Sequence, residues 1–176
     1  MSNLTPWQQL PHVWKTEAAF WSYIRSGLRK IWSIHPVKME FIKRYRVKVK
    51  NPNPNGRVPL VWGMTCGKCN GDFPMPVAKA LRGKIEVHDG KAFNYIEINH
   101  KHVAGSLKTK EDLANFASNL LFVTFKDLEP LCKKCHSVTT HSQRTGLSED
   151  EAELDKQALF IISNFGDKQW LKDKNL

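Results

Sequence analysis

The sequence predicts an α+β fold, with helices toward both ends of the chain and short strands between them. Apolar residues recur at helical spacing near both ends, whereas short alternating runs bounded by turn residues occupy the centre. The four cysteines form two Cys-x-x-Cys pairs, one on each side of that central region. With 176 residues, the chain is long enough for one independently folding core with extensions.

The first strongly periodic segment follows Thr16, a good helix N-cap. Its apolar positions recur every three or four residues and comprise Phe20, Trp21, Ile24, Leu28, Ile31 and Trp32. This pattern predicts an amphipathic helix that ends near Pro36. A second helical run covers residues 37–49, although alternation over residues 45–50 leaves a strand as an alternative for its end. The turn-rich residues 51–56 predict a linker between this extension and the core.

Positive charge is concentrated in the N-terminal third of the chain. The formal charge is +10, and residues 1–60 hold eleven Lys or Arg against two acids. Such an excess favours a polyanionic partner, with a membrane surface as the weaker alternative. We expect these Lys and Arg side chains to contact backbone phosphates. A simpler explanation of the charge excess, compatible with this one, is that the charges solvate the outer faces of the helices.

No segment resembles a signal peptide or is apolar enough to span a bilayer. We therefore expect a soluble, cytoplasmic protein with no membrane partner and no small-molecule cofactor. In a reducing compartment, paired cysteines favour metal over disulfides.

In the centre, alternation predicts a strand over residues 60–64, then two strands over residues 84–87 and 92–99 around a turn at 88–91. Residues 77–82 are ambiguous. A further apolar strand is expected over residues 121–125.

Three helices are expected in the second half of the chain. A capping box at Thr109–Asp112 opens a short helix, and another helix runs from Cys132 to about Arg144. Ser148 and Glu151 form a capping box that opens the last helix, in which the apolar residues Leu154, Leu159, Ile161 and Ile162 should face inward. Trp170 and Leu171 should cap the core.

Four thiolates in two Cys-x-x-Cys turns can close a tetrahedral zinc shell, so we expect a structural Zn²⁺ site. Its ligands would be Cys66, Cys69, Cys132 and Cys135. Buried free thiols are the alternative, because the two pairs are further apart in sequence than in a simple zinc ribbon. A closed four-cysteine shell has no open position for a substrate, so any catalysis must depend on other residues.

Several ordered motifs resemble those of the HNH endonuclease family, particularly its phage-encoded members. The motifs are Glu97-Ile-Asn-His100, Ala104-Gly-Ser-Leu-Lys108, Glu111-Asp-Leu113 and Asp127-Leu-Glu-Pro-Leu-Cys-Lys-Lys-Cys-His136. The resemblance covers about residues 62–145, and Phe20-Trp21 to Leu28-Arg29-Lys30 is similar to the N-terminal region of the phage proteins.

The resemblance implies a ββα-metal core that grips one divalent ion, Mg²⁺ or Mn²⁺, at a scissile DNA phosphate. The general base would be His100, with Asn99 and His136 as ion ligands and Asp127 holding the loop that carries the base. A neutral imidazole and a divalent ion suffice for phosphodiester hydrolysis.

Two positions depart from the family pattern. Asn99 replaces a charged or imidazole ligand, so ion binding should be weaker unless Glu97 on the same strand face contributes, and activity could be reduced or lost. Asp127 replaces an Asn and keeps only the acceptor.

The resemblance and the charge pattern together imply three segments and a DNA-binding surface. The segments are a basic helical DNA-binding extension (1–58), the nuclease core (59–146) and a C-terminal helical segment packed on that core (147–176). The expected DNA-contacting cations are Arg25, Arg29, Lys30, Lys43, Arg44, Arg46, Lys133, Lys134 and Arg144. His102 could contact phosphate, and His141 could reach the ion or the DNA. Single histidines more often have structural roles, and this is the alternative for both.

The expected function is hydrolysis of double-stranded DNA, by nicking or double-strand cleavage, in a phage homing or packaging role within the host cytoplasm. A catalytically weakened, zinc-stapled nucleic-acid-binding protein is the alternative, and an RNA-binding module is a third.

Overall fold

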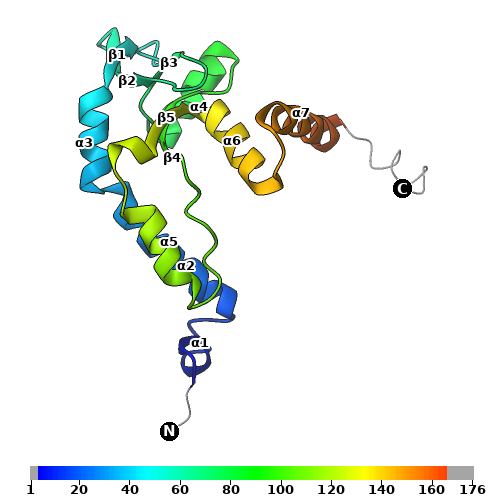
Figure 1. Cartoon of the computed structure of the whole chain (residues 1–176). Coiled ribbons are helices and arrows are strands. Elements are labelled where there is room, and N and C mark those ends of the chain that lie inside the picture. The colour runs from blue at the N-terminus through cyan, green and yellow to red at the C-terminus, as the bar shows by residue number, and fades with distance from the viewer. Residues whose placement is uncertain (1–3, 166–176) are drawn as a thin grey trace, which may run out of the picture.

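The computed structural model describes residues 4–165, in which helices and two small sheets confirm the α+β class (Figure 1). The α-helices are α1 (Pro6–Gln9), α2 (Glu17–Ser33), α3 (Pro36–Tyr45), α4 (Lys79–Asp89), α5 (Asp112–Leu121), α6 (Lys133–Thr145) and α7 (Glu149–Phe165). The strands are β1 (Val47–Lys50), β2 (Leu60–Thr65), β3 (Asp72–Pro74), β4 (Ile96–His100) and β5 (Leu128–Cys132), and a 3₁₀ turn, η1, covers Phe125–Asp127.

The predicted N-terminal helix is confirmed as α2. The Thr16 side chain accepts a hydrogen bond from the N–H of Ala19 at 3.1 Å, as an N-cap should. The following helix, α3, starts at Pro36, where a missing N–H does no harm. It ends at Tyr45, and residues 47–50 form β1, so the strand alternative for this stretch is correct.

Strands β1, β2 and β3 form an antiparallel sheet in that order. β1 pairs with β2 from Val47 opposite Gly63 to Lys50 opposite Leu60. Gly63 is required there, because a Cβ atom would lie 2.2 Å from the Phe73 carbonyl oxygen. The loop between β1 and β2 contains residues 51–56, so the expected linker connects two paired strands.

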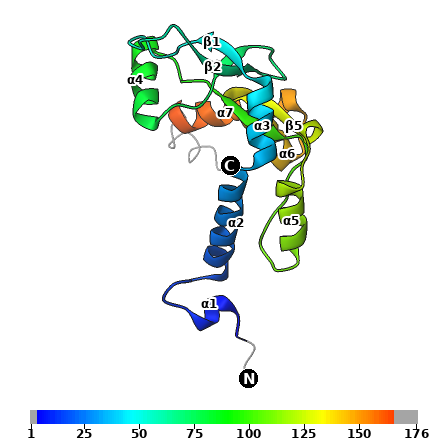
Figure 2. The same cartoon turned by 90° about the vertical axis from the view of Figure 1, so that its left-hand side faces the viewer.

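Strands β4 and β5 form a separate antiparallel pair, with Ile96 opposite Cys132 and His100 opposite Leu128. Helix α6 follows β5 directly and packs against both strands. Figures 1 and 2 show α2 and α5 side by side below this pair, with the three-stranded sheet above it.

The main hydrophobic core joins the N-terminal helices to both sheets. Its buried side chains include Trp21, Trp32, Phe41, Met64, Ile96, Phe116, Leu120, Leu128 and Leu131. Because α2 and α3 contribute tryptophans and a phenylalanine to it, residues 17–45 pack as part of the folded core.

The predicted strands over residues 84–87 and 92–99 around a turn are wrong in their first part. Residues 79–89 form α4, which ends at Gly90 with a positive φ of 63°. Leu81 and Ile85, one turn apart, pack with Phe93 and Tyr95 in a small second cluster, whereas Val87 is 86% exposed. A short apolar run fits either period, and packing decided for the helix. Of the second run, residues 96–99 form a strand, and this strand, β4, continues to His100.

The strand expected over residues 121–125 is also misplaced. α5 ends at Leu121, and the strand begins at Leu128 after the η1 turn. Thr124 and Asp127 stabilise that turn through a capping box, which an apolar pattern does not reveal.

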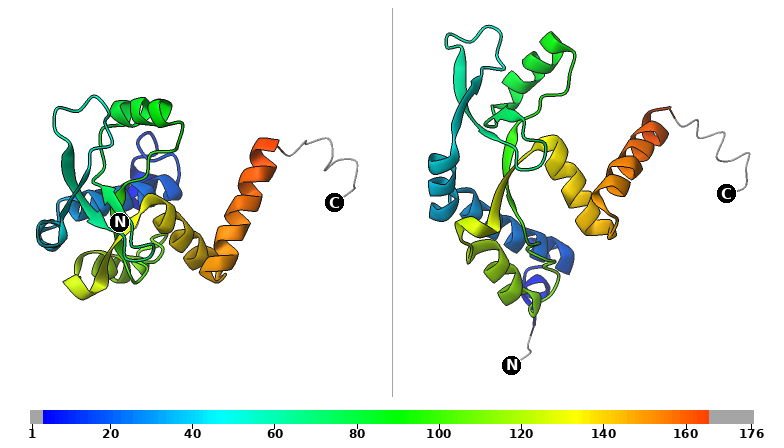
Figure 3. Two further views of the ribbon diagram at one scale, coloured as in Figure 1. Left: turned by 90° about the horizontal axis from the view of Figure 1, so that it is seen from above. Right: turned by 45° about the horizontal axis from the view of Figure 1, so that its top comes forward.

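The C-terminal region combines a correct helix start with a wrong inner face. The Ser148 N–H and hydroxyl donate to the Glu151 carboxylate at 2.9 and 2.7 Å, so the predicted capping box is confirmed. However, Leu154, Leu159, Ile161 and Ile162 are all exposed, and the fully buried residue of α7 is Ala152. α7 packs along α6 and extends away from the rest of the molecule (Figure 3). Trp170 and Leu171 lie outside the described residues.

Candidate metal centre and nucleic-acid interface

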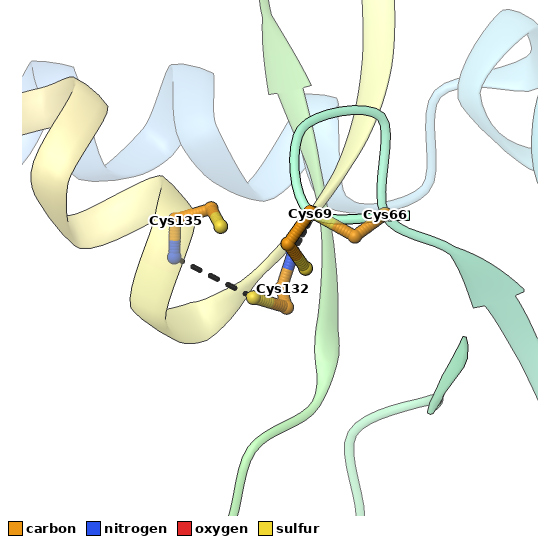
Figure 4. A group of neighbouring side chains, drawn as sticks. All are labelled: Cys66, Cys69, Cys132 and Cys135. Atoms are coloured by element: carbon orange, nitrogen blue, oxygen red, sulfur yellow. Dashed lines mark hydrogen bonds between the residues drawn. The ribbon is translucent and has the colours of Figure 1, made fainter. Parts of the chain in front are cut away.

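The two Cys-x-x-Cys pairs come together at one point. Cys66 directly follows β2 and Cys69 lies in the same turn, while Cys132 ends β5 and Cys135 lies in the first turn of α6. Their sulfur atoms all lie within 4.8 Å of one another (Figure 4). Residues far apart in sequence therefore form one compact four-sulfur cluster.

Backbone hydrogen bonds shape the turn that carries Cys66. The Cys66 N–H donates to the Gly71 carbonyl at 2.8 Å, and the Asn70 N–H donates back to the Cys66 carbonyl at 3.0 Å. Asn70 has a φ of 55°, a left-handed conformation that asparagine tolerates. The Gly67 N–H donates to the Pro130 carbonyl at 2.8 Å, which ties the turn to β5.

The turns also donate hydrogen bonds to sulfur. Burial raises the pKa of the Cys66 thiol, but N–H groups of Cys132, Cys69 and Lys68 outweigh burial and lower that pKa to about 7. Burial and the neighbouring Cys132 thiol raise the pKa of Cys135. Thiolates are the form of cysteine that binds metal. A cation among the four sulfurs would offset the repulsion between neighbouring thiolates and so favour this form.

The donor set fits a metal ion. Tetrahedral coordination at about 2.3 Å from sulfur requires sulfurs about 3.8 Å apart, and the four sulfurs here all lie within 4.8 Å of one another. Cys66 and Cys132 are buried and Cys69 is exposed, so the cluster lies at the edge of the core. Among residues 4–165, no other group of three or more His, Cys, Asp or Glu side chains gathers in this way.

His100 lies at the end of β4, on the side that faces α2 and α5. Its ring centre is 4.2 Å from that of Trp32, and its Nε2 is 3.1 Å from the Leu120 carbonyl oxygen. Burial is the main cause that lowers the pKa of His100, with Lys38 adding to it. Burial therefore favours the neutral form of this imidazole.

Asp127 and His102 share a pocket of about 210 Å³ with His100. The Asp127 carboxylate accepts hydrogen bonds from the Thr124 N–H and hydroxyl at 2.7 and 2.8 Å. Its backbone carbonyl accepts the Lys101 N–H at 2.9 Å. Asp127 thus links the residue that follows His100 to the η1 turn that precedes β5, in each case as a hydrogen-bond acceptor.

The opposite face of β4 carries Glu97 and Asn99, since side chains alternate along a strand. The His136 Nδ1 contacts the Glu97 carboxylate, which joins α6 to β4. Asn99 is 8% exposed and donates from Nδ2 to the Glu129 carboxylate at 3.0 Å. His136 is therefore joined to Glu97, whereas Asn99 and His100 face opposite sides of the strand pair.

Glu129 was missed by sequence reasoning. Its only sequence signal is its place two residues after Asp127, and strand register reveals that it lies opposite Asn99. His141 pairs with Asp155 across α6 and α7 at 2.6 Å, so its role here is to anchor α7.

The expected DNA-contacting cations fall into two groups. Arg25 donates to the Leu107 carbonyl at 2.9 Å, Lys43 lies 3.9 Å from Glu40 and Lys134 lies 2.9 Å from Glu153, so these three have local partners. The others are exposed or lie over aromatic rings: Arg29, Lys30, Arg44, Arg46, Lys133 and Arg144.

Comparison with known proteins adds no assignment. No family model, curated protein or solved structure matches the chain. Within residues 4–165, no helix has both the length and the apolar character needed to cross a bilayer. Function must therefore be inferred from the arrangement of the residues themselves.

Proposed function

We propose that this protein is a metal-dependent endonuclease of the HNH type that hydrolyses DNA phosphodiester bonds. The observation that carries the proposal is the contact between Glu97 of β4 and His136 of α6. A carboxylate and an imidazole meet between an antiparallel strand pair and the helix that follows it, beside the four-cysteine cluster. Carboxylate and imidazole are common ligands for catalytic divalent ions.

The four-cysteine cluster would bind Zn²⁺ in a structural role. Four thiolates in a closed shell favour zinc over harder ions such as Mg²⁺. Because Cys135 lies one residue before His136, zinc would hold the first turn of α6 in place and so position His136 against Glu97. A catalytic Mg²⁺ or Mn²⁺ would be a separate ion.

In this proposal His100 is the general base, and Asp127 positions the strand end that carries it. This role requires the His100 side chain to leave its contacts with Trp32 and Leu120 and reach the ion around the end of β4. Glu97 and His136 would hold the divalent ion, with Asn99 as a neutral third ligand. The ion supplies charge neutralisation for the phosphate and the leaving oxygen. Duplex DNA is the expected substrate, because the chain carries a net charge of +10.

Cleavage of supercoiled plasmid in the presence of Mg²⁺ or Mn²⁺ tests the proposal. We expect relaxed or linear product from the wild type and a loss of about 100-fold or more for His100→Ala and for Glu97→Gln. His88→Ala is the matched control, since His88 is exposed and its ring pairs with its neighbour Asp89. Absence of product with every divalent ion tried, while DNA still binds, would refute the enzymatic proposal.

A non-catalytic, zinc-stapled DNA-binding protein is the second candidate. The buried amide of Asn99 favours it, because its Nδ2 is engaged by Glu129 and it brings no charge to an ion. Duplex binding without cleavage, unchanged in His100→Ala, would support this second function over the first.

A further inference from the structure

The exposed face of the β1–β2 hairpin carries a row of cations beside a tryptophan. Strand register places Lys48 opposite Trp62 and Lys50 opposite Leu60. Side-chain alternation adds Arg46 to the same face and directs Val49, which is 5% exposed, to the other. The hairpin therefore has one buried face and one basic, aromatic face.

Two of these cations lie over the ring of Trp62. The Arg46 guanidinium carbon is 4.1 Å from the ring centre, and the Lys48 ammonium nitrogen is 3.9 Å from it. Trp62 itself is 42% exposed. An indole ring attracts cations, so Trp62 holds two positive charges close to each other. The positions of the Arg46 and Lys48 charges are therefore set in the free protein.

No nearby acid neutralises this face. From Phe41 to Gly71 the sequence contains seven Lys or Arg and no Asp or Glu. In the described part of the chain, ion pairs from this stretch involve only Lys43 with Glu40 and Lys68 with Glu149. Arg46, Lys48 and Lys50 thus present uncompensated charge to solvent, which is costly to the fold and useful for binding a polyanion.

We infer that this hairpin face binds duplex DNA, with Arg46 and Lys48 on backbone phosphates and Trp62 as the residue that positions them. A two-stranded ribbon fits the major groove of B-form DNA, whereas the deep, narrow major groove of A-form RNA does not admit one. The Trp62 ring already has two cations over it, so its role is to order charges instead of stacking on bases. The inference shares its substrate with the proposed nuclease but does not require cleavage.

The test compares two double variants with the same loss of charge. Arg46→Ala with Lys48→Ala removes the hairpin cations, and Lys84→Ala with Lys110→Ala removes exposed cations elsewhere. Binding of a fluorescent duplex of about 20 base pairs, long enough for one such site, is measured across salt concentrations without added Mg²⁺ or Mn²⁺. We expect the hairpin variant to bind about tenfold more weakly, with its salt slope reduced by about 2, and the control to stay near wild type.

Trp62→Leu keeps every charge and removes the ring. We expect it to weaken duplex binding about two- to fivefold, because the cations lose the ring that orders them. Bound-metal content and thermal unfolding, measured for each variant, separate a loss of binding from a loss of fold.

Equal losses in the two double variants would overturn the inference, because net charge alone would then explain binding. Unchanged binding in the hairpin variant would also overturn it, as would Trp62-dependent preference for single strands or RNA. If the wild type fails to cleave while binding depends on Arg46 and Lys48, the nuclease proposal fails and this inference stands. If the wild type cleaves DNA and the hairpin variant binds and cleaves as the wild type does, the nuclease proposal stands and this inference fails.

Discussion

The backbone N–H of Cys132 donates a hydrogen bond to the Sγ atom of Cys66 at 3.3 Å, across 66 positions of sequence. Both residues are buried. This contact places the turn after β2 against the end of β5, immediately before α6. The three-stranded sheet and the β4–β5–α6 unit are therefore joined at the cysteine cluster.

Loss of that cluster should destabilise the fold. We predict that Cys66→Ser and Cys132→Ser fail to hold one equivalent of zinc and unfold at lower temperature, by about 10 °C for a loss of about 3 kcal/mol. Metal analysis by mass spectrometry and thermal unfolding by circular dichroism measure both effects. Retention of one equivalent of zinc by either variant would contradict a four-cysteine site.

The packing of α7 is tested by two alanines on the same helix. Ala152 is fully buried against α6, whereas Ala158 is exposed. Ala152→Leu should destabilise the protein by about 1–3 kcal/mol through overpacking. Ala158→Leu should change the free energy of unfolding by no more than about 0.5 kcal/mol. Urea unfolding measures both, and equal effects would show that α7 packs through another face.

Asn99→Asp tests the limiting position of the candidate ion site. The new carboxylate would replace an amide that donates to Glu129, so two negative charges would meet at a buried position. We predict destabilisation of about 1–3 kcal/mol without a divalent ion, and a larger rise in melting temperature on adding Mn²⁺ than in the wild type.

The pH dependence of this variant has a defined sign. Repulsion raises the carboxyl pKa in the folded state, so the penalty is present at neutral pH and disappears as pH falls below the raised pKa. An identical response to Mn²⁺ in variant and wild type would argue that no ion binds at this face.

The start of α5 provides a second pH prediction. The Asp112 carboxylate accepts the N–H groups of Lys108 and Thr109 at 2.9 and 3.0 Å, and these bonds lower its pKa from 3.8. Asp112→Ala should lower the melting temperature more than its neighbour control Glu111→Ala. The stabilisation is complete well above pH 3.8 and is lost as pH falls through the lowered pKa, so the two variants should converge in acid.

Local patterns predicted the elements whose signals are strong and consistent. Thr16, Ser148 and the long apolar stripe of α2 were interpreted correctly, because caps and helical periodicity act within a few residues. The segment now seen as α4 was missed, since a run such as Lys84–Val87 satisfies both the strand and the helix period. Its helix is decided by contacts of Leu81 and Ile85 with Phe93 and Tyr95.

The residues of the candidate site were predicted in part. The spacing of the two Cys-x-x-Cys pairs pointed to all four cysteines. The resemblance to the HNH family pointed to His100 and His136, with Glu97 as a contributor beside Asn99. The sequence did not show that Glu97 would contact His136, that Glu129 would engage Asn99, or that Trp62 would hold Arg46 and Lys48. The contact between Glu97 and His136 depends on how α6 packs on β4. The other two relationships depend on strand register, which is set by which faces are buried.

What the sequence by itself determined is the class of fold, the donor set of the metal centre and the concentration of positive charge before residue 60. These follow from residue type and short-range spacing. Only the tertiary structure decided which side of β4 each polar residue occupies, which face of α7 is buried and which cations remain unpaired. The physical reason is that such choices depend on burying apolar surface between segments distant in sequence, and no local pattern encodes the partner.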